Sequence, residues 1–179
     1  LNISVLDPDK NAPCRHLVKK FTQGSLTDYD TVYDFGKDKD LITIEIENIN
    51  VSALEELEKL GKSVYPKPSS LKIIRDKGLQ KEFYQASGFP SSSFRLHKDT
   101  SDILQAITEG TLSIPFVQKL RSDGYDGKGV HVVRVQDDLA NLMKGPSLTE
   151  DIVDIDKEIA VIVGRSINGD MATFPAVEM

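Results

Sequence analysis

The sequence has little of what marks secreted or membrane proteins. Its 179 residues include one cysteine, Cys14, and no tryptophan. A single cysteine cannot form an internal disulfide, so the chain needs no oxidising compartment and we expect a cytoplasmic protein. The longest uninterrupted aliphatic run covers only residues 159–163, far below the roughly 20 residues of a membrane-spanning helix. We therefore expect no membrane partner.

An excess of basic residues is also missing. Lys and Arg number 22 against 28 Asp and Glu, which gives a net charge of −6, so we expect no nucleic-acid partner. Hydrophobic residues make up 39% and charged residues 28%, a composition typical of an ordinary folded protein. The length allows one large domain or two small ones.

Strand and helix patterns alternate in the first third of the chain. Residues 1–6 and 41–46 are rich in β-forming side chains, and Ser52 is placed to cap a helix that ends at Gly61. This alternation favours a parallel sheet, whose ligands meet the carboxyl ends of the strands. The residues expected at that crevice are Asp7, Glu45, Glu47 and Asn48. The plainer interpretation is that these side chains are solvated at turns and strand edges.

Residues 64–68 contain Pro66 and Pro68 and form a stiff connector, where we expect a domain boundary. A single helix is predicted after it, capped by Ser69 or Ser70 and ending at Gly88. Three basic residues fall on the polar side of this helix: Arg75, Lys77 and Lys81. A basic helix face is most often simply solvated.

The second half predicts shorter elements that form an α+β unit. Strands are expected from residue 94 onward and near residues 116–120, 131–135 and 148–153, with helices near 101–109 and 137–144. Residues 157–165 and 171–177 are expected to form a hairpin around Asn168-Gly169.

A glycine-rich segment lies between two of these strands, where Lys119 precedes residues 121–129. Three glycines in six positions let successive N–H groups turn towards one anion, which suits a phosphate. The spacing matches neither a Walker loop nor a dinucleotide fingerprint. The alternative is an ordinary hairpin loop without function.

Two carboxylates follow downstream at Glu150 and Glu158. A strand and linker at this place can present backbone groups to a purine edge, and a carboxylate one strand further on can accept two ribose hydroxyls. Taken alone, such carboxylates are more often surface charges.

Together, Lys119, the string Gly124-Tyr125-Asp126-Gly127-Lys128-Gly129, Glu150 and Glu158 resemble the ATP-grasp fold. The strings Leu6-Asp7-Pro8-Asp9, Thr43-Ile44-Glu45-Ile46-Glu47-Asn48, Arg75-Asp76-Lys77 and Phe174-Pro175 resemble one family within it, the 5-(carboxyamino)imidazole ribonucleotide synthetases, which are the ATPase subunits of phosphoribosylaminoimidazole carboxylase. The resemblance covers essentially the whole chain.

The resemblance implies an α/β chain that is a central fragment of such an enzyme. Residues 1–68 would be a truncated Rossmann-like pre-ATP-grasp domain without its first strand, and residues 69–92 a connecting helix. Residues 93–153 would be the small α+β lid of the ATP-grasp domain, and residues 154–179 the beginning of its large lobe.

The resemblance also implies a nucleotide site. Lys77 would touch the phosphates of ATP, and Lys119 would bridge the adenine side and the phosphates. Residues 124–130 would close over the phosphates, residues 150–153 would read the adenine edge, Glu158 would hold the ribose, and Glu178 would face the nucleotide. The implied binding residues are Lys77, Lys119, Gly124, Tyr125, Asp126, Gly127, Lys128, Gly129, Val130, Glu150, Asp151, Ile152, Val153, Glu158 and Glu178.

The implied reaction is the ATP- and bicarbonate-dependent carboxylation of 5-aminoimidazole ribonucleotide through carboxyphosphate, in purine biosynthesis. Mg²⁺ would take part, with its ligands and the catalytic residues expected beyond Met179, and the full-length enzyme would be a homodimer. The isolated fragment would then be inactive. Two alternatives remain open at this point: another ATP-grasp ligase, such as a formate-dependent glycinamide ribonucleotide transformylase, and a non-catalytic nucleotide-binding fragment.

Overall fold

Strands and helices alternate along the first part of the chain. The computed structural model describes residues 2–122 and 129–179. In chain order the first part contains β1 (Ser4–Asp7), a 3-10 helix (Pro13–His16), β2 (Lys20–Gln23), α1 (Tyr29–Gly36), β3 (Leu41–Thr43), α2 (Val51–Lys59) and β4 (Ser63–Tyr65). β1 pairs with β2 and β3 pairs with β4, both in parallel. Parallel pairing is present as predicted, but the two predicted strands β1 and β3 belong to two separate two-stranded sheets instead of one.

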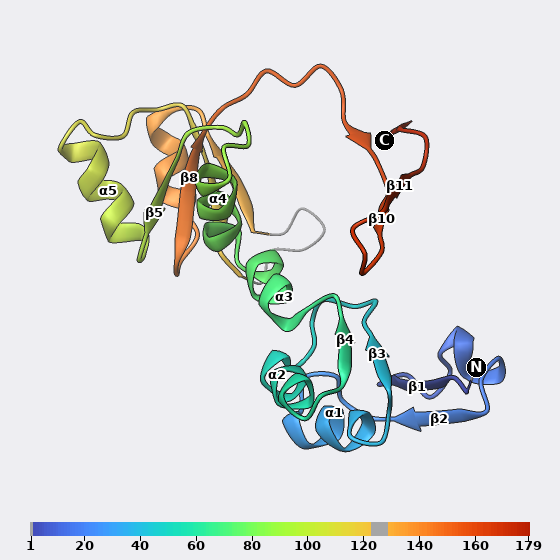
Figure 1. The fold of residues 1–179 in the computed structure, drawn as a ribbon. Helices are drawn as coiled ribbons and strands as arrows, with labels where there is room; N and C mark the ends of the chain where they lie inside the picture. The colour runs from blue at the N-terminus through green and yellow to red at the C-terminus, as the bar shows by residue number, and fades with distance from the viewer. Residues whose placement is uncertain (1, 123–128) are drawn as a thin grey trace.

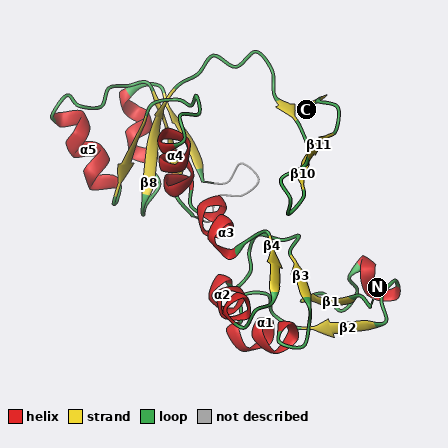
Figure 2. Cartoon of the chain, in the orientation of Figure 1, coloured by secondary structure: helices red, strands yellow, loops and turns green. Residues whose placement is uncertain are grey.

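The core of the first part lies between its helices and β3 and β4. α1 and α2 lie side by side next to β4 (Figure 2), and Leu54 and Leu57 of α2 are fully buried. A Cβ atom on Gly36 would lie 2.4 Å from Cδ1 of Leu57, so glycine lets α1 approach α2 closely. The expected cap at Ser52 is wrong by two residues, because Asn50 accepts the hydrogen bond from the N–H of Ala53.

The single helix predicted from Ser69 or Ser70 to Gly88 is in fact two helices. α3 (Pro68–Arg75) begins with a proline and has no capping side chain, and α4 (Lys77–Ala86) follows after a one-residue break. At the break Asp76 is extended, with φ −123° and ψ 107°, and its carboxylate accepts the N–H groups of Gly78 and Leu79. An aspartate competes with the helix in this way and caps a new one. The apolar residues keep a helical spacing across the break, from Leu71 and Ile74 to Leu79 and Phe83, so the sequence pattern does not predict the break.

The second part is built on one antiparallel sheet. Its elements are β5 (Phe94–His97), α5 (Thr100–Thr108), β6 (Phe116–Leu120), β7 (Val130–Val133), a 3-10 helix (Gln136–Asn141) and β8 (Ser147–Asp151). The strand order is β5-β8-β6-β7. Ile103 of α5 packs with Phe116 and Val133 under the sheet. Where a helix was expected near residues 137–144, the structure has the shorter 3-10 helix Gln136–Asn141.

The last part is an arm of two short antiparallel pairs. β9 (Ile159–Ala160) pairs with β12 (Val177–Glu178), and β10 (Val163–Arg165) pairs with β11 (Met171–Thr173). Gly169 sits in the turn with φ 92°, which confirms the predicted hairpin around Asn168-Gly169. Figure 1 shows the arm standing apart from the sheet of β5 to β8.

Among residues 2–122 and 129–179, none of the helices combines the length and the apolar character needed to cross a membrane.

Candidate functional site

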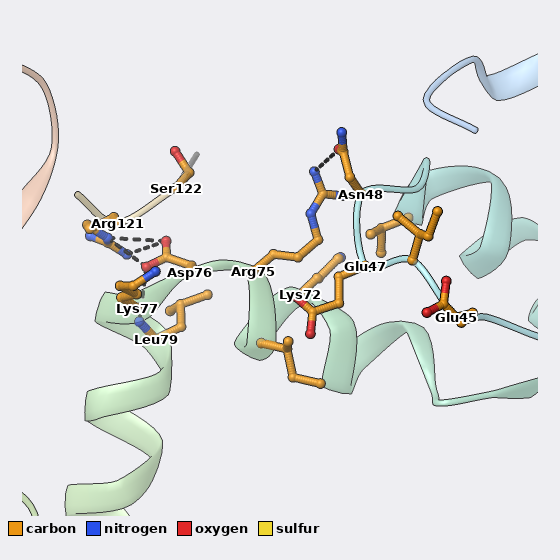
Figure 3. Close-up of a pocket in the computed structure, with 13 residues that line it drawn as sticks. Glu45, Glu47, Asn48, Lys72, Arg75, Asp76, Lys77, Leu79, Arg121 and Ser122 are labelled. Carbon is orange, nitrogen blue, oxygen red and sulfur yellow. Dashed lines mark hydrogen bonds and ion pairs between the residues drawn. The ribbon is translucent and has the colours of Figure 1, made fainter. Parts of the chain in front are cut away.

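A pocket of about 890 Å³ opens between the first part of the chain and the end of β6. It receives side chains from the segment after β3, from the start of α2, from α3, from the start of α4 and from the two residues that follow β6 (Figure 3). The lining residues are Glu45, Ile46, Glu47, Asn48, Val51, Lys72, Ile74, Arg75, Asp76, Lys77, Leu79, Arg121 and Ser122. Four of them are basic and three are acidic, so the pocket can bind a ligand that carries both a phosphate and polar donor groups.

The expected crevice residues are placed unequally by the structure. Glu45, Glu47 and Asn48 all line the pocket, as predicted for the segment that follows a parallel strand. Asp7 is not among the lining residues, and its Oδ1 instead accepts the N–H of Asp9 at 2.7 Å in the turn after β1. The interpretation of Asp7 as a turn residue is therefore the one that the structure supports.

Arg75 fixes the loop that follows β3. Its Nη1 donates to the carbonyl of Ile49 at 2.7 Å, and its Nη2 donates to Oδ1 of Asn48 at 3.5 Å (Figure 3). A guanidinium presents several donors in one plane, so one side chain can hold a loop at two points. Arg75 thus orders the wall of the pocket that carries Glu47 and Asn48.

Asp76 and Arg121 form the opposite wall. Nε of Arg121 donates to Oδ1 of Asp76 at 2.8 Å and Nη2 donates to Oδ2 at 2.7 Å, which is the two-pronged geometry of a strong ion pair. Partial burial acts to raise the pKa of Asp76, but the hydrogen bonds from Arg121 and from two backbone N–H groups outweigh it and hold that pKa below its ordinary value. The N–H of Lys77 also donates to the carbonyl of Arg121 at 2.9 Å.

A second cluster lies on the sheet of the second part. Nζ of Lys119 on β6 is 2.7 Å from Oε2 of Glu150 on β8. Nζ of Lys81 on α4 is 3.2 Å from Oε1 of the same carboxylate. Burial acts to raise the pKa of Glu150, but Lys119 and then Lys81 outweigh it, so that the pKa lies below its ordinary value. Glu150 is therefore a charged group at neutral pH, held between two ammonium groups.

Lys81 does not lie on an exposed polar face, contrary to the expectation from the helix pattern. It is only 7% exposed, because α4 turns this side chain towards β8 and the segment before β5. Sequence periodicity places a lysine on the polar side by default, and a lysine is rarely buried unless it is paired. Glu150, 69 positions later in the chain, provides that pairing, and no local pattern could reveal it.

The structure distributes the other predicted binding residues over three places. Lys77 lines the pocket, and the residues after Glu150 (Asp151, Ile152 and Val153) lead out of β8 towards the arm. Glu158 and Glu178 make their contacts within the arm, where Nζ of Lys157 lies 3.3 Å from Oε2 of Glu178 and the carbonyl of Glu158 accepts the N–H of Met179. Of the predicted binding residues, Lys119 and Glu150 are in direct contact with each other.

The glycine-rich segment is described only at its ends. Gly124, Tyr125, Asp126, Gly127 and Lys128 lie outside the described residues. Gly129 has φ 82°, a conformation that favours glycine, and its carbonyl accepts the N–H of Leu120 at 2.9 Å. Val130 begins β7 directly opposite Lys119.

Sequence reasoning missed two contributors to these clusters, Lys81 and Arg121. Arg121 directly follows the last residue of β6, and its charge two positions after Lys119 is the one local signal that could have drawn attention to it. Within the described residues, no three His, Cys, Asp or Glu side chains gather as a metal site.

Two family models match the chain, the ribonucleotide synthetase preATP-grasp domain over residues 1–75 and the ATP-grasp domain over residues 82–179. The N5-carboxyaminoimidazole ribonucleotide synthase of Staphylococcus aureus (strain MRSA252) is 32% identical over 181 residues, which cover 98% of this chain and 47% of that relative.

Two solved structures are similar over the same extent. The crystal structure of N5-carboxyaminoimidazole ribonucleotide synthetase from Thermotoga maritima has a TM-score of 0.85 and 34% identity, covering 98% of this chain and 46% of that one. The N5-carboxyaminoimidazole synthase from Aspergillus clavatus, in complex with ADP and 5-aminoimidazole ribonucleotide, has a TM-score of 0.84 and 26% identity, with 98% and 46% covered. The chain spans about half the length of these relatives.

Proposed function

Because the chain belongs to the ATP-grasp family, we propose that it is part of an enzyme that uses ATP and bicarbonate to carboxylate 5-aminoimidazole ribonucleotide in purine biosynthesis. The observation that carries the proposal is the joint match of both parts of the chain, because a shared ATP-grasp domain alone would fit many ligases. The first part matches a ribonucleotide synthetase domain, and a relative of the same fold holds ADP together with this ribonucleotide.

The nucleotide site of the proposal is built around Lys119 and Glu150. Lys119 is 30% exposed at its side chain and Glu150 only 10%, so the ammonium faces outward from a buried carboxylate and is available to a phosphate. Residues 124–130 would close over the phosphates and residues 150–153 would meet the adenine edge. Lys77, Glu158 and Glu178 complete the proposed set, with the last two brought in by the arm.

The pocket of Figure 3 is the proposed site of the ribonucleotide. Asn48 and Glu47 offer an amide and a carboxylate for hydroxyl or amino groups, and Arg75 orders this wall. Lys72 adds positive charge for the phosphate of the ribonucleotide, and Lys77, assigned to the phosphates of ATP, lines the same pocket.

The proposed domain boundaries are residues 1–68 for the first domain, 69–92 for the connection, 93–153 for the lid and 154–179 for the large lobe.

The proposed reaction has two steps. A bicarbonate oxygen attacks the γ-phosphorus of ATP, which gives carboxyphosphate and ADP. The amino group of the ribonucleotide then attacks the carboxyl carbon, the phosphate leaves, and the nitrogen loses a proton to give the carbamate. Such transfers depend on positioning and charge neutralisation, so lysines and backbone amides are the groups of this chain that contribute.

Mg²⁺, a homodimer and a cytoplasmic location belong to the proposal through the family resemblance. Mg²⁺ would neutralise charge on the phosphates of ATP. Among the described residues, no three His, Cys, Asp or Glu side chains gather as a metal site, and the proposed ligands of Mg²⁺ lie beyond Met179.

The test is the turnover of ATP by the full-length protein with 5-aminoimidazole ribonucleotide. ADP release should require both the ribonucleotide and bicarbonate, and ¹³C-labelled bicarbonate should appear in a carbamate product. ADP release that needs formate and glycinamide ribonucleotide would support the alternative ligase and contradict the proposal. Nucleotide binding without turnover under any of these conditions would support a non-catalytic module.

A further inference from the structure

Lys81 is a buried cation with all its hydrogen-bonding capacity in use. Its Nζ lies 2.5 Å from Oγ of Ser91, 2.9 Å from Oγ of Ser92 and 3.1 Å from the carbonyl of Ser92. The remaining partner is Glu150, at 3.2 Å. The ammonium is thus tied to the segment before β5 on one side and to β8 on the other.

Glu150 uses its two carboxylate oxygens for two different lysines. Oε1 faces Lys81 and Oε2 faces Lys119. The side chains of Lys81 and Glu150 are 8% and 10% exposed, whereas Lys119 is 30% exposed. The three charges therefore form a row from the inside of the molecule to its surface, with Lys119 at the outer end.

Stability alone does not explain such a row. Removing two charges from water costs free energy that their attraction often fails to return, and apolar replacements of buried pairs are often neutral or stabilising. A buried ion pair does fix geometry, because the side chains around it hold one rotamer. The outer lysine, which on the proposed function touches the nucleotide, gains a fixed direction from the inner one.

We propose that Lys81 is a positioning residue of the nucleotide site, which holds the carboxylate of Glu150 so that its second oxygen fixes the ammonium of Lys119 at the place of the phosphates. The inference rests on the proposed nucleotide binding and adds to it a residue that touches no nucleotide itself. Its partners Ser91 and Ser92 serve as the anchor on the inner side.

The experiment measures the affinity of the full-length protein for ADP by calorimetry, between pH 5.5 and pH 8. The variants are Lys81→Met, Glu150→Gln and the double variant, with Lys59→Met as the matched control. Lys59 is an exposed lysine on α2 whose Nζ lies 3.0 Å from Oε2 of Glu56 on the same helix, and it lies outside the proposed sites.

At pH 8, Lys81→Met is expected to weaken ADP binding about tenfold, while Lys59→Met leaves it unchanged. In the Glu150→Gln background the Lys81→Met change should add less than a twofold effect, because the two residues act through one contact. Two independent, multiplying effects would overturn the inference.

The pH profile separates positioning from a purely structural role. Lys81 from α4 and Lys119 from β6 are the charged groups that the described structure places against Glu150, and β5 contributes the uncharged Phe94. Without Lys81 the pKa of Glu150 rises, so ADP affinity of Lys81→Met should fall further as the pH drops towards 5.5. The wild type and Lys59→Met should share a single, shallower profile.

A Lys81→Met variant that unfolds at a lower temperature but binds ADP like the wild type at every pH would overturn the inference and leave the proposed function intact. A wild-type protein that binds no ADP would overturn both. Should Lys81→Met fail to fold, Ser91→Ala keeps the charge and removes one anchor, and we expect it to weaken ADP binding two- to threefold; unchanged binding there contradicts the inference.

Discussion

Asp76 and Arg121 are 45 positions apart in the sequence, yet they meet through two short hydrogen bonds of 2.8 and 2.7 Å. The contact joins the first turn of α4 to the end of β6, directly before the glycine-rich segment. The same carboxylate also accepts the N–H groups of Gly78 and Leu79. One aspartate thus starts a helix and ties it to the sheet.

These two roles of Asp76 can be separated by mutation. Asp76→Asn keeps a good capping oxygen but loses the charge, and we expect it to lower the free energy of unfolding by about 1–2 kcal/mol, a contribution typical of a partly solvated charged hydrogen bond. Asp76→Ala loses the cap as well and should cost about 1 kcal/mol more. Urea unfolding of the two variants measures the difference, and equal losses would show that the cap contributes nothing.

The guanidinium of Arg121 packs directly against the backbone of Gly78. A Cβ atom there would lie 2.6 Å from Nε of Arg121 and 3.0 Å from Oδ1 of Asp76. Gly78→Ala should therefore destabilise the protein, although alanine is the better helix former by about 1 kcal/mol. In an Arg121→Gln background the shorter side chain removes the clash, and the same change should become neutral or stabilising. A Gly78→Ala variant that is more stable in the wild-type background contradicts this reading of the contact.

Lys119→Met tests the outer end of the charged row. A hydrogen bond to a charged group is worth about 1.5–3 kcal/mol, so ATP affinity in the full-length protein should fall by that amount. The dissociation constant, measured at equilibrium, checks the expectation. An unchanged constant would remove Lys119 from the proposed nucleotide site.

His97 gives the fold an expected dependence on pH. It is buried, its Nε2 lies 2.9 Å from Oγ1 of Thr149, and burial, together with the charge of Arg95, holds its pKa below the ordinary value of 6.5. As the pH falls below 6.5, the unfolded chain takes up a proton that the folded one resists, so stability decreases on going from pH 7 to pH 5. His97→Gln should lose less stability over that interval in urea unfolding. An equal loss in both proteins would mean that other groups cause it.

The family and the α/β class could be predicted from the sequence because the signals are local strings. The Gly-Tyr-Asp-Gly-Lys-Gly string and the strand-forming runs stand in unbroken stretches, and the family matches confirm both the resemblance and the predicted fold class. β6 was placed at its observed bounds for the same reason, since its Phe116, Val117 and Leu120 stand directly before the glycine-rich segment.

What escaped prediction depends on contacts between distant residues. The break at Asp76 is stabilised by Arg121 as well as by its own turn, and the burial of Lys81 requires Glu150. α1 and β2 were missed because their residues 20–36 carry weak and mixed local preferences that packing against α2 and β1 resolves. Local pattern reading has no access to such partners.

The strand order of the second part has a consequence for the synthesis of the chain. β8 is the last of the four strands to leave the ribosome, yet it lies between β5 and β6, and β5 stands at the edge of the described sheet, hydrogen-bonded to β8. A nascent chain that ends before Ser147 can form the local β6–β7 hairpin but leaves β5 without a neighbour. The sheet therefore closes late and over a long loop, which is the slow kind of folding step. Until β8 is in place, the edges of β5 and β6 can pair with strands of other chains. Lys119 on β6 also lacks its ion-pair partner Glu150, which lies on β8.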